Sequence, residues 1–181
     1  MNVAIIPARG GSKRIPRKNI KLFNGMPMIS WSIMAALESK CFDKVIVSTD
    51  DEEIAEVARQ YGAEVPFLRP PELADDNAGT MPVIAHAINC LKNAGEILDL
   101  VCCIYATAPF IRSKDLQVGL ERMKGSDFKF AFAVTSFSFP IQRAFRIDPV
   151  VGIEMFQPEQ FHTRSQDLVP AYHDAGQFYF G

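Results

Sequence analysis

Short apolar runs alternate with amphipathic stretches along the first two thirds of the chain. The continuously apolar runs predict buried strands at residues 3–6, 45–47, 63–67, 100–105 and 129–135. Apolar residues at helical spacing predict helices at residues 27–37, 52–61, 80–93 and 113–123. This alternation favours an α/β fold with a mostly parallel sheet and helices on both faces.

Individual residues mark where these helices begin and end. Asp50 or Asp51 is expected to cap the second helix and Ser113 the fourth, because their side-chain oxygens can accept hydrogen bonds from free N–H groups. Pro27 suits the first position of the first helix. Gly62 suits the end of the second helix, where a left-handed backbone is common.

The last third of the chain has a different pattern and holds ten of the fourteen phenylalanines. Residues 136–148 and 150–156 alternate as hairpin strands do, and residues 177–180 predict a final strand. We expect one domain over residues 1–181 with an arm at 137–161. Three interpretations of the apolar side chains of this arm stay open: a contact with a second copy of the chain, part of a sugar pocket, or ordinary core. Because the sequence ends on a strand without a closing helix, we expect the domain to be incomplete at its C-terminus.

Charge is distributed unevenly along the chain. Among 181 residues, 19 are basic and 21 acidic, and the formal net charge of −2 by itself argues against a polyanionic ligand. The first acidic residue, however, is Glu38, and six basic residues precede it. From Glu38 onward, 13 basic residues stand against 21 acidic ones. All the excess positive charge therefore lies in one short N-terminal stretch.

The remaining composition excludes several classes of protein. No apolar run approaches the ~20 residues that a membrane span needs. The four cysteines lack C-x-x-C spacing, and the three histidines lack the spacing of metal ligands. We therefore predict a cytoplasmic protein with reduced thiols and no membrane partner.

Most of the early basic residues gather in residues 6–20, IPARGGSKRIPRKNI, directly after the first strand. Loops at this edge of a parallel sheet bind ligands in open α/β folds. Gly10 and Gly11 allow the backbone to approach a ligand, and Ser12 adds a hydroxyl. The loop also supplies five cations, which are Arg9, Lys13, Arg14, Arg17 and Lys18. Free N–H groups and fixed cations together suit a polyphosphate.

Other interpretations of this loop fit the sequence less well. It contains neither the Walker A pattern nor G-x-G-x-x-G. A nucleic-acid surface usually spreads its cations over a face with stacking aromatic residues, whereas residues 6–20 contain no aromatic residue. We therefore predict no nucleic-acid partner, and a solvated basic loop is the alternative that stays open.

The loop resembles the N-terminal motif of the CMP-sugar synthetases, which are cytidylyltransferases that activate nonulosonic acids. Their pattern, I-P-A-R-G-G-S-K-x-I-P-x-K-N, matches residues 6–19. Further matches lie at residues 47–50, 69–76, 106–109, 164–168 and 176–179. Residues 104–110 and 172–179 resemble the branch of the family that acts on pseudaminic acid. A sialic or legionaminic acid enzyme and a catalytically inactive nucleotide-binding relative remain as alternatives.

This resemblance implies a three-layer, Rossmann-like nucleotide-diphospho-sugar transferase fold with a protruding dimerisation arm. It implies that a homodimer joins CTP to a nine-carbon keto sugar acid and releases pyrophosphate, for surface glycans or flagellin glycosylation. It also implies Mg²⁺ held by a D-x-D-like pair of aspartates. Because no D-x-D occurs in residues 1–181, we expect the metal ligands beyond Gly181.

The resemblance also assigns roles to residues of this sequence. Lys18 and Arg9 are expected to be catalytic, with Lys18 nearest the α-phosphate. The nucleotide-binding residues are expected to be Ala8, Arg9, Gly10, Gly11, Ser12, Lys18, Asn19, Arg69 and Asp76. The sugar-binding residues are expected to be Tyr105, Thr107, Arg164, Gln166, Asp174 and Gln177. Arg164 either pairs with the sugar carboxylate or forms a surface ion pair.

Overall fold

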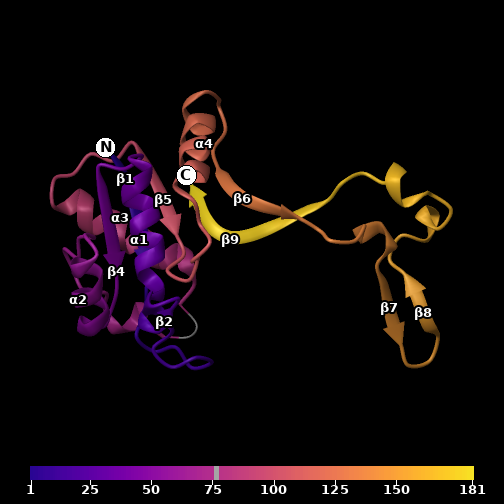
Figure 1. Ribbon diagram of the computed structural model, residues 1–181, viewed down its shortest axis with the longest axis horizontal. Helices are drawn as coiled ribbons and strands as arrows, with labels where there is room; N and C mark the ends of the chain where they lie inside the picture. The colour runs from indigo at the N-terminus through magenta and orange to yellow at the C-terminus, as the bar shows by residue number, and fades with distance from the viewer. Residues whose placement is uncertain (76–77) are drawn as a thin grey trace. The chain divides into compact units, whose positions relative to one another are not determined.

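A computed structural model describes residues 1–75 and 78–181 of the chain (Figure 1). It divides into two compact units, one of residues 1–133 and 176–181 and one of residues 134–175. The boundary between them passes through two strands, β6 (Ala131–Ser136) and β9 (Tyr172–Phe180). The segment predicted as an arm falls within the second unit.

The first unit is built on a five-stranded sheet with the strand order β4-β1-β5-β9-β6. The strand β1 (Asn2–Pro7) lies between β4 (Lys44–Ser48) and β5 (Leu100–Ile104) and is parallel to both. The strand β9 runs antiparallel to β5. Residues 3–6 of β1 are completely buried, as expected for a central parallel strand that is covered on both faces.

The described residues form four α-helices, all in the first unit: α1 (Met28–Ser39), α2 (Glu52–Gln60), α3 (Thr80–Asn93) and α4 (Ser113–Lys124). Helices α1, α2 and α4 contribute to one apolar core and α3 to another. Side chains of β1 alternate between these two cores, which therefore lie on opposite faces of the sheet (Figure 1). The predicted α/β fold with a mostly parallel sheet covered on both faces is confirmed.

The strand predicted at residues 63–67 is not formed as a strand. This segment makes only isolated bridges to the neighbouring strand, between Ile46 and Glu64 and between Thr49 and Leu68. Pro66 lies between the two bridging positions and has no N–H to donate to a β-ladder. The apolar pattern therefore marked a segment that follows the sheet edge without becoming a regular strand.

Two helix starts also differ from the sequence prediction. Pro27 precedes α1 and belongs to a short strand, β3 (Met26–Pro27), which pairs with β2 (Leu22–Phe23). Ser113 is the first residue of α4 and not its cap; Arg112 occupies the cap position without a side-chain cap. Arg112 instead forms an ion pair with Asp115, at 2.7 Å, within the first turn.

The second unit contains the predicted hairpin, now defined as β7 (Phe145–Asp148) and β8 (Gly152–Met155). The carboxylate of Asp148 accepts hydrogen bonds from Val150 and Val151 and shapes the turn. Most large apolar side chains of this unit are exposed, including Phe137, Phe139, Phe145, Ile147, Ile153, Phe156 and Phe161. This surface does not have the burial of an ordinary core.

None of the helices in the described part of the chain is both long and apolar enough to cross a membrane. All four cysteines are free thiols. Burial raises the pKa of Cys102, and it raises the pKa of Cys103 to about 12, so both thiols stay protonated at neutral pH. Their burial agrees with the predicted structural, reduced cysteines.

Candidate functional site

A cavity of about 790 Å³ lies in the first unit at the carboxyl ends of β1 and β5. The loop after β1 forms one wall, and residues directly after β5 form another. Seven of the residues proposed from the sequence line this cavity: Arg9, Ser12, Lys18, Asn19, Arg69, Tyr105 and Thr107. Three further loop residues, Lys13, Arg14 and Ile15, line it as well. The cavity therefore lies at the predicted edge of the sheet and has a cationic lining.

Three predicted nucleotide-binding residues lie in the loop but are not among the described residues that line the cavity: Ala8, Gly10 and Gly11. Ala8 is buried, and its N–H donates to the carbonyl of Ser48 at 2.9 Å. Asp76 lies outside the residues that the structure describes. At Ala8 the backbone of the loop thus still pairs with the last residue of β4, and the cationic side chains that line the cavity come after this position in the chain.

The predicted sugar-binding residues are divided between the two units. Tyr105 and Thr107 line the cavity, and the N–H of Tyr105 donates to the carbonyl of Gln177 at 2.9 Å. Arg164, Gln166 and Asp174 belong to the second unit, and their contact with the sugar remains a prediction. The exposed Arg164 side chain pairs with Asp167 at 2.7 Å, which matches its alternative role as a surface ion pair.

Asn19 has a role that reasoning from the sequence missed. It lies in a short 3-10 helix, η1 (Lys18–Ile20), and is buried. Its Nδ2 donates to the carbonyl of Arg9 at 2.9 Å. Because Arg9 and Asn19 lie near opposite ends of the basic loop, this hydrogen bond holds the loop closed beside the cavity.

Arg69 is a buried cation in the wall of the cavity. Its side chain is only 6% exposed and donates to the backbone carbonyl of Ser48 and to the Ser48 Oγ, the latter at 3.3 Å. Burial lowers the pKa of Arg69 and the charge of Arg9 lowers it further, whereas Asp50 acts in the opposite direction. A guanidinium stays protonated in proteins, so two mutually repelling cations line one cavity. An anionic ligand would relieve this repulsion.

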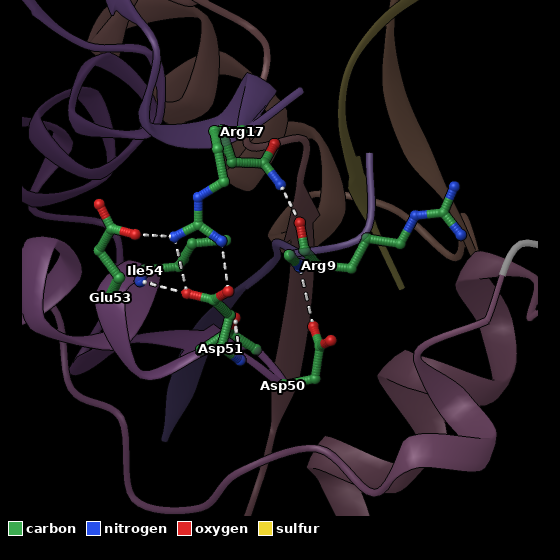
Figure 2. A network of polar contacts seen from close by, with 9 residues as sticks. Arg9, Arg17, Asp50, Asp51, Glu53 and Ile54 are labelled. Carbon is green, nitrogen blue, oxygen red and sulfur yellow. Dashed lines mark hydrogen bonds and ion pairs between the residues drawn. The ribbon is translucent and has the colours of Figure 1, made fainter. Parts of the chain in front are cut away.

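Arg17 does not serve the cavity, contrary to the grouping of five loop cations expected from the sequence. Its guanidinium pairs with both carboxylate oxygens of Asp51 and with Glu53 (Figure 2). Asp51 also accepts from the N–H of Ile54 at 3.0 Å and is the N-cap of α2. Of the two aspartates expected as alternative caps of this helix, Asp51 is therefore the one confirmed. Arg17 therefore attaches the loop to the start of α2.

The two loop glycines have different surroundings. The N–H of Gly10 donates to Asp50 at 3.0 Å, and a Cβ added at Gly10 would lie 2.5 Å from an Asp51 carboxylate oxygen. A Cβ added at Gly11 would meet no atom of the described residues within 4 Å. Close approach to α2 therefore requires glycine at position 10, whereas no atom in the part of the chain that the structure describes requires glycine at position 11.

We expect Gly10→Ala to destabilise the fold and Gly11→Ala to leave its stability nearly unchanged. The added methyl group at Gly10 must displace the loop or Asp51, and overpacking of this kind costs about 1–3 kcal/mol. The same methyl group at Gly11 enters open space, where substitutions stay within about 0.5 kcal/mol. Urea unfolding of both variants measures the difference, and equal stabilities would contradict this account of Gly10.

The described residues do not form a protein-only metal centre. No three His, Cys, Asp or Glu side chains among them are placed to hold one ion. In the loop region, Asp50 accepts from Gly10 and Asp51 is paired with Arg17. We therefore assign no metal ligand and derive no chemical step through a metal.

Comparisons with known proteins agree with this geometry. A family model described as Cytidylyltransferase matches residues 3–166. A pseudaminic acid cytidylyltransferase of Campylobacter jejuni is 52% identical over 99% of this chain and 78% of that protein. A Helicobacter pylori protein, named as a pseudaminic acid cytidylyltransferase and a UDP-2,4-diacetamido-2,4,6-trideoxy-beta-L-altropyranose hydrolase, is 39% identical over 99% of this chain and 34% of its own length.

A solved structure shares the fold. It is that of CMP:2-keto-3-deoxy-manno-octonic acid synthetase complexed with CTP, with a TM-score of 0.72. The match covers 99% of this chain and 73% of that chain at 19% sequence identity. At this identity the likeness concerns the architecture alone.

Proposed function

Because this chain belongs to the cytidylyltransferase family, we propose that it is the enzyme that joins CTP to pseudaminic acid, giving CMP-pseudaminic acid and pyrophosphate. The observation that carries this proposal is the 52% identity to the Campylobacter jejuni enzyme over 99% of the chain. The Helicobacter pylori relative has the same activity in its name. A legionaminic acid synthase of Legionella pneumophila is 40% identical over only 66% of this chain.

The reaction requires one anion to attack another. The anomeric hydroxyl of the sugar acid releases its proton to water and attacks the α-phosphorus of CTP, a new oxygen–phosphorus bond forms, and the bond to the leaving pyrophosphate breaks. Fixed cations reduce the repulsion between the reactants and stabilise the charge that develops on the leaving group. Arg9 and Lys18 fit this task because they share one cavity with the buried cation Arg69.

The nucleotide and the sugar acid need separate parts of the site. We assign the phosphates to Arg9, Ser12 and Lys18, and the cytidine to Asn19 and Arg69 with the backbone of the loop. Tyr105 and Thr107, which line the cavity just after β5, are left for the sugar acid. Arg164 would have to exchange its ion pair with Asp167 for the sugar carboxylate.

A pyrophosphate-release assay with CTP, Mg²⁺ and one sugar acid at a time tests the proposal. We expect turnover with pseudaminic acid and little or none with sialic or legionaminic acid. Turnover of sialic acid alone would overturn the choice of sugar. CTP binding without turnover of any of the three would favour a catalytically inactive nucleotide-binding relative. The Mg²⁺ and cytoplasmic location expected from the sequence remain predictions.

We also propose that the hairpin of the second unit forms part of a homodimer contact. Ile147 and Ile153 are directly paired across β7 and β8 and are 78% and 69% exposed. Phe145 lies on the same face, whereas the pair of Arg146 and Glu154, at 2.6 Å, occupies the other. An exposed apolar face of this kind is suited to a second copy of the chain.

Replacing Ile147 with aspartate is expected to convert the dimer to a monomer, because a charge would be buried at an apolar contact. Light scattering at micromolar concentration measures the mass. Arg146→Ala is the matched control, since it changes the opposite face of the same strand and is expected to keep the dimer. A monomeric parent protein would contradict the proposal.

A further inference from the structure

The basic loop is attached to the protein through a residue that lies outside the cavity. The side chains of Arg9 and Arg17 point in different directions: Arg17 enters a cluster of carboxylates, and Arg9 extends away from it (Figure 2). Arg9 lines the cavity, whereas Arg17 is not among the described residues that do so. The residue after Arg17 is Lys18, the proposed catalytic cation.

We propose that Arg17 is a positioning residue, whose ion pair with Asp51 at the start of α2 fixes the turn that presents Lys18 and Asn19 to the nucleotide. This inference rests on the proposed function, because it assumes that the cavity binds CTP. It assigns to Arg17 and Asp51 an effect on CTP binding that neither exerts by direct contact.

The backbone at Arg17 needs such an anchor. Arg17 has φ 54° and ψ 31°, which is a left-handed conformation that non-glycine residues adopt at a cost. Its carbonyl accepts from Ile20 at 3.1 Å and from Lys21 at 2.9 Å, so this strained residue starts the 3-10 turn η1. The orientation of Lys18 and Asn19 therefore depends on the conformation of Arg17.

Asp51 is a well-fixed partner for Arg17. One carboxylate oxygen accepts both from Arg17, at 3.0 Å, and from the N–H of Ile54. The N–H of Asp51 donates to the Thr49 hydroxyl at 3.2 Å. The hydrogen bond from Arg17 is the main reason that the pKa of Asp51 is lowered, so the carboxylate is ionised at neutral pH. A planar guanidinium and a fixed carboxylate form a directional pair.

The other end of the loop is attached at the same place. Asp50, the neighbour of Asp51, accepts from the N–H of Gly10, and Gly10 packs closely against Asp51. The hydrogen bond from Asn19 to Arg9 then joins the two ends of the loop. Two consecutive aspartates before α2 thus hold the loop, and loss of the Arg17 pair frees the end that carries Lys18.

Three variants test this arrangement: Arg17→Gln, Asp51→Asn and the double variant. Asparagine caps helices about as well as aspartate, so Asp51→Asn keeps the cap of α2 while it removes the ion pair. The readout is the dissociation constant of CTP without sugar acid, measured by calorimetry. Misplaced binding groups cost affinity, and we expect each single variant to bind CTP about tenfold more weakly. The double variant should be no weaker than Arg17→Gln alone, because Arg17→Gln already removes the pair with Asp51 together with the pair with Glu53.

The matched control is Arg59→Gln. Arg59 pairs with Glu52 at 2.8 Å on the exposed surface of the same helix, so its loss removes an arginine–carboxylate pair of the same kind. We expect parent-like CTP binding from this variant. The melting temperatures of the single variants and the KM for sugar acid should stay close to those of the parent, which separates positioning from general destabilisation.

Several outcomes would overturn the role of Arg17. Parent-like CTP binding by Arg17→Gln would exclude positioning. Weak binding by Arg17→Gln together with normal binding by Asp51→Asn would show that the pair with Asp51 does not position the loop, and that Arg17 acts through Glu53 or through phosphate instead. Fully additive losses would show that the two residues act separately. A parent protein that binds no CTP would remove both this inference and the proposed function, whereas CTP binding without sugar turnover would remove only the proposed activity.

Discussion

Replacing Lys18 with alanine is expected to lower kcat for cytidylyl transfer about 100- to 1,000-fold, with little change in the KM for the sugar acid. Lys18 lies in the basic loop after β1 and lines the cavity together with the cations Arg9 and Arg69. Its charge is needed most when the leaving pyrophosphate forms, so its loss should affect turnover more than sugar binding. Steady-state pyrophosphate release measures both parameters.

Lys21→Ala is the matched control for Lys18. Lys21 carries the same charge three residues further along, is exposed, and is not among the described residues that line the cavity. We expect this variant to keep near-parent turnover. If Lys18→Ala also kept near-parent turnover, the proposed catalytic role of Lys18 would be wrong.

Replacing Arg69 with methionine is expected to weaken CTP binding about 100-fold, since a buried charge–anion contact and its supporting hydrogen bonds are worth several kcal/mol. Methionine fills much of the same space but cannot donate to the Ser48 carbonyl. The Ser48 carbonyl keeps its hydrogen bond from the N–H of Ala8, but a lost hydrogen bond from a charged group costs about 1.5–3 kcal/mol, so the free energy of unfolding should fall as well. CTP titration and urea unfolding measure the two effects.

Two further variants separate the contributions of Arg69. Arg69→Lys keeps the charge but loses the planar fork that reaches Ser48 and Leu73, so we expect it to recover only part of the CTP affinity. Arg122→Met removes an exposed arginine from α4 and should change neither measurement. Parent-like CTP affinity in Arg69→Met would exclude Arg69 from the nucleotide site.

Hydrophobic periodicity was sufficient to predict the layers of the first unit. Continuous burial of residues 3–6 and helical spacing in α2 and α3 each reflect local sequence, and the structure confirms them. The strand predicted at 63–67 failed because a proline interrupts the donors that a ladder needs. The local hydrophobic pattern therefore predicts the burial of side chains more reliably than it predicts hydrogen bonds between backbone groups of neighbouring strands.

The role of Arg17 could not be predicted from composition, because its partners lie more than thirty residues away in the sequence. A usable signal was nevertheless present. Consecutive parallel strands often lie side by side and end at one edge of the sheet, so the loops after β1 and β4 meet. Asp50 and Asp51 follow the end of β4 after a single residue, which places two carboxylates beside a basic loop.

The strand order has a consequence for synthesis of the chain. In the described sheet, β9 lies between β5 and β6, although β6 is made first. Until the ribosome has translated β9, the backbone of β6 has no neighbouring strand to pair with. Two exposed phenylalanines, Phe130 just before β6 and Phe132 within it, lie at this unpaired strand. The nascent chain can assemble β4, β1 and β5, but it completes the sheet only when β9 inserts between two segments already made.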